Sequence, residues 1–328
     1  MTLQITIIGM GQIGTSLGLA LEEFSEDLIR VGHDKSRSIA NQAKGEGAVD
    51  RVAITLSGSV KNADIVILAL PIQEVRAVLE HIALDLKEEV LVIDTAPLKT
   101  PVLDWVDQFL PEHTSYVGLM PVINSAYLED PGYGVDAARA DMFEGCLMGL
   151  ITGSRTDQKA VKMASQIIEL VGADPFFIDP AELDGVMSRV HVLPRVLASS
   201  LLGISMGSPG WREGQKLAGK AFTSVTHPLT ADDEPGALAA MAVHNQANTV
   251  RVVNELIREL MELRDQVEKG QEDALQEKFQ FQQRKRDLWR QDREEGAWSD
   301  QKSSPELEQR SMLGDLFGFR KPKPPEED

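Results

Sequence analysis

Cysteine is almost absent from this chain. Cys146 is the single cysteine among 328 residues, so no disulfide can form within one copy of the protein. The histidines and this cysteine do not have the paired spacing of a structural zinc site. These absences exclude a disulfide-stabilised secreted scaffold, predict that the protein binds no metal, and favour a reducing compartment.

Positive charge is scarce relative to negative charge. Lys and Arg total 33 against 51 Asp and Glu, which gives a formal net charge of -18. An acidic protein repels nucleic-acid backbones and anionic membranes, so we expect neither as a partner. The chain also lacks an apolar run of membrane-spanning length, and no basic stretch or small-residue cleavage site precedes its first hydrophobic segment. We therefore expect a cytoplasmic protein whose partners are small molecules or other proteins.

The first half of the chain alternates short β-branched segments with helical patterns. Continuous apolar runs at 3–8 and 65–70 are typical of strands buried on both faces, whereas 12–24 has apolar residues three or four positions apart, as on one helix face. The same patterns predict strands at 28–32, 90–93, 116–119, 147–152 and 176–178, and helices at 36–44, 72–81, 101–109 and 157–171. This alternation predicts the α/β class, with an N-terminal Rossmann domain, a doubly wound parallel sheet, over residues 1–179.

After Asp179 the pattern changes to long helices. Residues 182–206 and 236–263 are helical, apolar stretches, and the second carries a broad hydrophobic stripe. We predict an all-helical C-terminal domain over residues 180–264 that binds substrate and forms a homodimer. A core within one chain explains the stripe nearly as well as a dimer does.

Beyond Arg264 the composition becomes polar and charged. Residues 265–328 are predicted to form a charged helix followed by a disordered tail. Leu313, Leu316, Phe317 and Phe319 cluster within this polar segment. They could dock on a protein partner or on the body of the protein, and weak local collapse explains them equally well.

Three glycines follow the first predicted strand. In the spacing of Gly9, Gly11 and Gly14, the first glycine makes a tight turn, the second lets a pyrophosphate approach the backbone, and the third lets helix and strand pack closely. The helix that follows offers unsatisfied N–H groups and a partial positive charge to phosphates. We predict that these glycines bind a dinucleotide, together with the intervening Met10, Gln12 and Ile13.

An acidic residue ends the second predicted strand. Asp34 lies roughly twenty residues beyond the glycine turn, where a carboxylate accepts hydrogen bonds from a ribose 2′-hydroxyl, and this favours NAD. Lys35 and Arg37 follow directly and could instead hold the 2′-phosphate of NADP. Leu70 and Pro71, after a neighbouring strand, are predicted to form an apolar edge beside the cofactor.

Five segments of the chain resemble the prephenate and arogenate dehydrogenase family in order and spacing. They read GMGQIGTSLGLAL, ADIVILALPIQEV, VIDTAPLKTPV, VGLMPVINSAYL and LDGVMSRVHVLPRVLA. The resemblance implies a Rossmann domain paired with a helical dimerisation domain. It also implies oxidation of prephenate or arogenate with NAD(P) and loss of carbon dioxide, a step of tyrosine biosynthesis.

Several positions depart from the family's pattern. The serine that contacts the substrate hydroxyl is replaced by Pro97, the histidine that accepts the hydroxyl proton by Met120, and a further histidine by Val192. The arginine that binds a substrate carboxylate would fall near Ser224. A positioned general base is worth ~10²- to 10⁴-fold in rate, so these replacements predict a rearranged active site or lost catalysis.

Three residues remain as candidate catalytic groups. Lys99 follows the strand predicted at 90–93, Asp184 lies in the fifth segment, and His191 is offset by one residue from the replaced histidine, about 100° around a helix. Each has a plain structural explanation. Lys99 would be a surface cation at a helix start, Asp184 a favourable first-turn acid, and His191 a hydrogen-bonded histidine in an apolar helix.

Two kinds of function fit these residues. The first is an NAD(P)-dependent dehydrogenase with a rearranged site, acting on prephenate, arogenate or another small oxo or imino compound. The second is a dinucleotide-binding protein that has lost catalysis and acts as a sensor or scaffold through its tail. The fold alone does not choose between them, because chemistry resides in the site.

Overall fold

One sheet forms the N-terminal part of the molecule. The computed structural model describes residues 2–130, 132–229 and 235–296. Within them the strand order is β3-β2-β1-β4-β5-β6-β7-β8, and neighbouring strands are parallel except β6 and β7. The strands are β1 (Leu3–Ile8), β2 (Leu28–His33), β3 (Arg51–Val52), β4 (Ile65–Leu68), β5 (Leu91–Asp94), β6 (Ser115–Met120), β7 (Leu147–Ile151) and β8 (Asp174–Phe177). The first six strands have the order of a dinucleotide-binding Rossmann domain.

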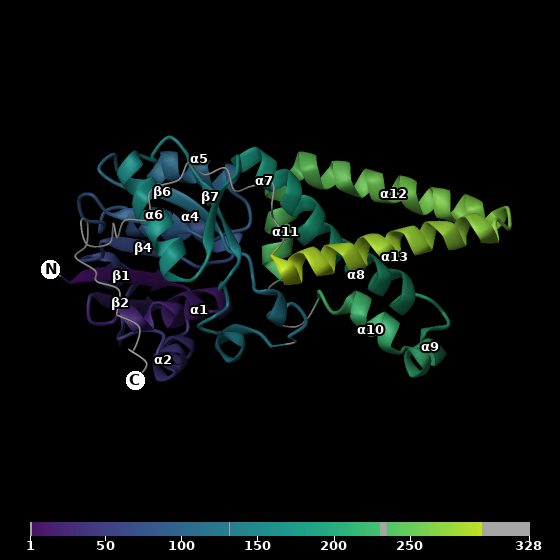
Figure 1. Ribbon diagram of the computed structural model, residues 1–328, viewed down its shortest axis with the longest axis horizontal. Helices are drawn as coiled ribbons and strands as arrows, with labels where there is room; N and C mark the ends of the chain where they lie inside the picture. Colours follow the sequence, from purple (N-terminus) through teal and green to yellow (C-terminus); the bar gives the residue numbers. More distant parts are fainter. Residues whose placement is uncertain (1, 131, 230–234, 297–328) are drawn as a thin grey trace, which may run out of the picture.

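Helices cover both faces of this sheet (Figure 1). The helices α1 (Gln12–Ala20), α2 (Arg37–Gly45) and α6 (Gln158–Leu170) contribute to one core, and α3 (Leu56–Val60), α4 (Ile72–Ile82) and α5 (Thr100–Phe109) to the other. Successive residues of β1 face opposite sides, so Ile7 joins the first core and Ile8 the second. Burial on both faces explains why the strands read as continuous apolar runs.

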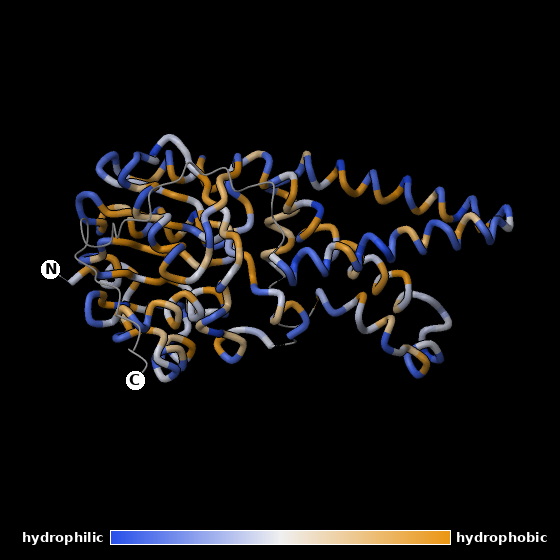
Figure 2. Tube along the Cα trace, viewed as in Figure 1, coloured by the Kyte–Doolittle hydropathy of each residue, from blue (hydrophilic) through white to orange (hydrophobic). Residues whose placement is uncertain are grey.

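The C-terminal part is helical. It contains α7 (Pro180–Met187), a π-helical turn at Ser188–Val192, α8 (Leu193–Met206), α9 (Trp211–Leu217), α10 (Lys220–Thr226), α11 (Pro235–His244), α12 (Gln246–Glu268) and α13 (Glu272–Glu295). In Figure 1, α12 and α13 form an antiparallel hairpin that projects away from the sheet. Figure 2 shows hydrophobic residues concentrated on the strands, whereas hydrophilic and hydrophobic residues alternate along this hairpin.

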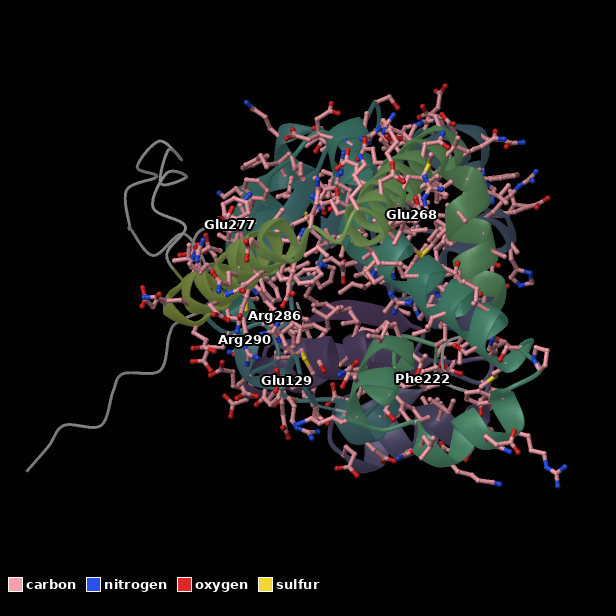
Figure 3. The ribbon with its side chains drawn as sticks, turned by 90° about the vertical axis from the view of Figure 1, so that its right-hand side faces the viewer. Glu129, Phe222, Glu268, Glu277, Arg286 and Arg290 are labelled. Atoms are coloured by element: carbon pink, nitrogen blue, oxygen red, sulfur yellow. The ribbon has the colours of Figure 1, made fainter. Side chains whose placement is uncertain are left out.

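Helix α13 runs back from the tip of the hairpin to the sheet domain. Near the tip, Lys278 forms an ion pair with Glu259 of α12 at 2.7 Å. At its other end, Arg290 forms an ion pair with Glu129 at 2.7 Å, and the Arg293 guanidinium donates to the carbonyl oxygen of Ile123 at 2.6 Å. Arg290 and Glu129 are labelled in Figure 3. The end of α13 therefore holds the loop that follows β6.

The predicted architecture, a Rossmann domain with a doubly wound parallel sheet followed by helices, is confirmed, and one pair of neighbouring strands departs from the parallel arrangement. Strand β7 runs antiparallel to β6, because the described residues between them, 121–130 and 132–146, contain only the short 3₁₀ turns η2 (Ser125–Tyr127) and η3 (Gly134–Ala137) instead of a crossover helix. The helix predicted at 182–206 contains the π turn, and the stretch at 236–263 is two helices that meet at Asn245.

Several short elements had no predicted counterpart. Strand β3 is 2 residues long, and α9 and α10 have 7 residues each, too short to show an amphipathic period. The predicted tail and its cluster of four apolar residues lie outside the described residues. No helix in the described part of the chain is long and apolar enough to span a membrane.

Candidate nucleotide and substrate site

The glycine turn connects β1 to α1. Gly9 has φ +93°, and a Cβ there would lie 2.3 Å from the carbonyl oxygen of Ala69. A Cβ on Gly14 would lie 1.9 Å from the carbonyl oxygen of Gly9. Both distances are far inside van der Waals contact with backbone atoms, so the packing of the turn itself requires glycine at these two positions.

Gly11 is different from its neighbours. A Cβ on Gly11 would meet no protein atom within 4 Å, so the protein's own packing does not require glycine there. Gly11 is also the N-cap of α1 and supplies no side-chain cap, and the first turn of α1 contains no acidic residue. An open backbone at an uncapped helix N-terminus fits the pyrophosphate of a dinucleotide.

Asp34 is fixed beside this turn. One carboxylate oxygen accepts from the Met10 N–H and the other from the Ser36 N–H, each at 2.8 Å. Since Asp34 directly follows β2, these bonds hold its carboxylate at the end of the strand next to β1. This is the position from which a carboxylate accepts a hydrogen bond from the 2′-hydroxyl of an adenosine ribose.

The other predicted cofactor residues lie around the same turn. Met10 is fully buried and Ile13 packs on the same core. The Gln12 side chain donates to the carbonyl oxygen of Ala137 at 3.3 Å. Leu70 is half-buried, with Cδ2 2.9 Å from the position of a Cβ on Gly9, and Pro71 is the N-cap of α4. The structure thus brings the predicted nucleotide-binding residues together at the carboxyl ends of β1, β2 and β4.

The long connection after β6 also reaches the turn, which the sequence did not indicate. The Arg139 N–H donates to the Ser16 hydroxyl of α1 at 3.0 Å. η3 packs against α1 and α2. Arg139 and η3 of this connection therefore lie against α1, and α13 holds the same connection at Ile123 and Glu129.

Lys99 lies inside the protein. Its side chain is fully buried, and Nζ lies 2.9 Å from each carboxylate oxygen of Asp94, the last residue of β5. The Tyr116 hydroxyl donates to the same carboxylate. Gly118 leaves room for the lysine, because a Cβ at this position would lie 3.0 Å from Lys99 Cδ. The three side chains form a buried polar cluster between β5 and β6.

Burial shifts the pKa values within this cluster. Desolvation lowers the pKa of the Lys99 ammonium, and the charge of Asp94 opposes this shift. Desolvation, followed by the charge of Asp94, raises the pKa of the Tyr116 hydroxyl well above its ordinary value. Tyr116 therefore remains a neutral donor to a carboxylate that Lys99 neutralises.

Asp184 connects α7 of the helical domain to the start of α5 in the Rossmann domain. Its carboxylate is 4% exposed and accepts from the N–H groups of Lys99 at 2.7 Å and Thr100 at 3.1 Å. It thereby caps the N-terminus of α5 from α7. The Asn245 side chain, between α11 and α12, donates to the carbonyl oxygen of Asp184 at 2.7 Å. Sequence reasoning missed Asn245, because a single asparagine in a helical pattern carries no signal of a long-range contact.

His191 lies in the π turn that connects α7 to α8. It is half-buried, and its carbonyl oxygen accepts from the Arg195 guanidinium at 3.1 Å. The next residue, Val192, is fully buried and packs in the core with Leu183 and Met187. π turns occur frequently at functional sites, and this one places His191 outside the core and Val192 within it.

The positions that depart from the family's pattern lie in two places. Pro97 follows β5 and Met120 ends β6, and both are half-buried at the same edge of the sheet as the glycine turn. Ser224 is exposed on α10. No cluster of His, Cys, Asp and Glu among the described residues could hold a metal ion.

Together, the fold and the glycine turn define a Rossmann-type nucleotide-binding protein with a helical C-terminal domain. Residues 17–176 match the model of the prephenate dehydrogenase nucleotide-binding domain, and residues 179–281 match that of the prephenate dehydrogenase dimerization domain. The glycine turn lies just before the first match.

Curated and solved proteins agree with these matches. Prephenate dehydrogenase of Bacillus subtilis is 30% identical over 272 residues, which cover 82% of this chain and 71% of that protein. Cyclohexadienyl dehydrogenase of Zymomonas mobilis is 26% identical over 284 residues, covering 86% and 94%. The structure of Aquifex aeolicus prephenate dehydrogenase with hydroxyphenyl propionate and NAD+ has a TM-score of 0.75 at 21% identity, covering 87% of this chain and 98% of that one. The chain belongs to the prephenate dehydrogenase family.

Proposed function

We propose that this protein is an NAD-dependent dehydrogenase that oxidises prephenate or arogenate with loss of carbon dioxide. The observation that carries the proposal is the open backbone at Gly11 beside the fixed carboxylate of Asp34. This arrangement fits a dinucleotide and occurs in a chain of the prephenate dehydrogenase family. When bound, the nicotinamide would accept a hydride from the carbon that bears the substrate hydroxyl.

NAD is the proposed cofactor rather than NADP. The Asp34 carboxylate is held by two backbone N–H groups and still has lone pairs that can accept from a ribose hydroxyl. A 2′-phosphate at the same place would bring two negative groups together. Gly9, Gly11 and Gly14 would bind the pyrophosphate and position the cofactor, with Leu70 and Pro71 beside it.

We assign His191 as the group that takes the hydroxyl proton during oxidation. It is a half-buried imidazole outside the core, whereas Met120 and Val192 cannot accept a proton. Arg195 lies four residues later, on the same helix face, and could pair with a substrate carboxylate. Loss of the hydroxyl proton and the hydride leaves a carbonyl; carbon dioxide then departs, its bonding electrons aromatise the ring, and the resulting phenolate oxygen takes the proton back from His191.

Lys99 and Asp184 act as positioning residues in this proposal. Both are buried and engaged by protein groups, Lys99 with the carboxylate of Asp94 and Asp184 with the start of α5. They fix the segment after β5 that contains Pro97. Their role is to hold this segment and α7 in a defined arrangement at the site.

The proposed assembly is a homodimer through the helical domain. Large hydrophobic side chains are exposed on this domain, among them Ile204 at 75%, Leu217 at 85% and Val243 at 72%. A second copy packed on this domain would cover these side chains, and the matched domain is a dimerization domain. Sedimentation equilibrium should give twice the mass of one chain, and a monomeric mass would contradict the assembly.

The catalytic assignment is tested with purified protein, NAD and a panel containing prephenate, arogenate and related hydroxy acids. We expect nicotinamide reduction with prephenate or arogenate, and a fall in kcat of ~10²-fold or more in His191→Gln. The matched control is His113→Gln, which changes an exposed histidine outside the site. Equal losses in both variants, or none in His191→Gln, would contradict the role of His191. Tight NAD binding without turnover on any substrate would instead favour a protein that has lost catalysis.

A further inference from the structure

We infer that Glu74 makes the nucleotide site select NAD over NADP, because it holds Lys35 away from the position of a 2′-phosphate. The inference rests on the proposed nucleotide binding and deepens it. It concerns the residues around the adenosine ribose and does not depend on the identity of the oxidised substrate.

An ion pair joins two strand ends across the glycine turn. Lys35 follows β2, and Glu74 lies in the first turn of α4, after β4. Strand β1 lies between β2 and β4, so the two ends are about 10 Å apart, two strand spacings. Lys35 Nζ nevertheless lies 2.5 Å from Glu74 Oε1. The two long side chains thus connect the segments that follow the two strands flanking β1.

The surroundings of Asp34 leave few donors for a phosphate. The Ser36 N–H, a backbone donor next to the ribose position, already donates to Asp34. Lys35 and Arg37 are then the nearest cations in the sequence. The Lys35 ammonium, whose side chain is 65% exposed, is paired with Glu74, whose side chain is 25% exposed.

NADP and NAD place different groups beside Asp34, a charged 2′-phosphate and a neutral 2′-hydroxyl. The 2′-phosphate of NADP carries more than one negative charge at neutral pH and requires cations. Here it would meet the carboxylates of Asp34 and Glu74, with the Lys35 charge already compensated. The 2′-hydroxyl of NAD requires only an acceptor, and Asp34 supplies it. Glu74 therefore penalises NADP in two ways, by its own charge and by engaging Lys35.

Dissociation constants of NADH and NADPH, measured by nicotinamide fluorescence, test the inference independently of turnover. The proteins compared are the wild type, Glu74→Gln, Lys35→Ala and the double variant. Wild type should bind NADH more tightly than NADPH. Glu74→Gln should bind NADPH about tenfold more tightly than wild type, the value of one charge-assisted hydrogen bond, and NADH within about twofold. The control is Glu80→Gln, an exposed glutamate on the same helix, which should change neither constant.

The double variant separates the release of Lys35 from a simple charge effect. If Glu74 acts through Lys35 as well as by its own charge, the gain in NADPH binding is smaller in the double variant than in Glu74→Gln. An equal gain with and without Lys35, or no gain in Glu74→Gln, overturns the inference while leaving the proposed function intact. A wild-type protein that binds neither nucleotide overturns both.

Discussion

Replacement of Lys99 by methionine tests whether the buried ion pair between Lys99 and Asp94 stabilises the folded protein. The substitution keeps the length of the side chain and removes its charge. It leaves the Asp94 carboxylate fully buried without its cation, although the Tyr116 hydroxyl and the Ala96 N–H still donate to it. Breaking a buried pair at one partner costs about 3–5 kcal/mol, and the two remaining donors favour the lower end, about 3 kcal/mol.

The double variant Asp94→Asn and Lys99→Met removes both charges. It should recover part of the lost stability, because a neutral amide is far less costly to bury than an unpaired carboxylate. A matched control is Lys87→Met, which removes a pair with Asp64 that is about one-third exposed on each side. Partly exposed pairs contribute about 0–1 kcal/mol, so this variant should unfold close to wild type.

The free energies are measured by urea unfolding, followed by tryptophan fluorescence and circular dichroism. We expect Lys99→Met to be the least stable of the three variants. A loss below about 1 kcal/mol in Lys99→Met, equal to that of Lys87→Met, would refute the view that Lys99 is part of a buried structural cluster. A double variant that is less stable than Lys99→Met would refute the coupling to Asp94.

Three further predictions concern the turn, the buried tyrosine and α13. Gly11→Ala should leave the unfolding midpoint unchanged but weaken NADH binding at least about tenfold, whereas Gly14→Ala should destabilise the fold itself, as denaturant titrations and fluorescence binding will show. The raised pKa of Tyr116 means that the folded state retains this proton when the unfolded state loses it, so its contribution to stability is complete below pH ~10 and is lost as pH rises above that value. In an alkaline titration, Tyr116→Phe should match wild type in tyrosinate absorbance until the protein unfolds, and an earlier deficit would contradict the assignment. Arg293→Ala removes the bond to the carbonyl of Ile123 and should speed hydrogen exchange in the loop after β6, and unchanged exchange there would show that α13 does not hold the loop.

The sequence alone was sufficient to predict most strands and helices of the Rossmann domain. Continuous apolar runs predicted its strands, and the glycine spacing predicted the tight turn between β1 and α1 with Asp34 nearby. These features are local, so a single sequence displays them. The structure adds that only Gly11 has open space where a side chain would be, while Gly9 and Gly14 are required by backbone packing.

The direction of a side chain was not predictable in the same way. Lys99 was expected near the cofactor because it follows a strand that ends at that edge of the sheet. Its side chain turns inward instead, because Gly118 leaves space and Asp94 supplies a charge. Both partners depend on the packing of β5 against β6, which periodicity does not reveal.

The helical domain also contains features that the periodicity of the sequence does not predict. Apolar periodicity predicted a helix across His191 but not the π turn within it, since a single π turn of 5 residues is too short to show a period of its own. The turn decides which neighbour is buried, and it is Val192. Contacts such as that of Asn245 with Asp184, 61 residues apart, have no local signal at all.

The most direct test of the account is a single stoichiometric assay on the wild-type protein with NAD and prephenate, repeated with arogenate. The account predicts that reduced nicotinamide and carbon dioxide form in equal amounts with one of the two substrates, and that omission of NAD abolishes both. Saturable NAD binding with no reduced nicotinamide and no carbon dioxide from either substrate would contradict it.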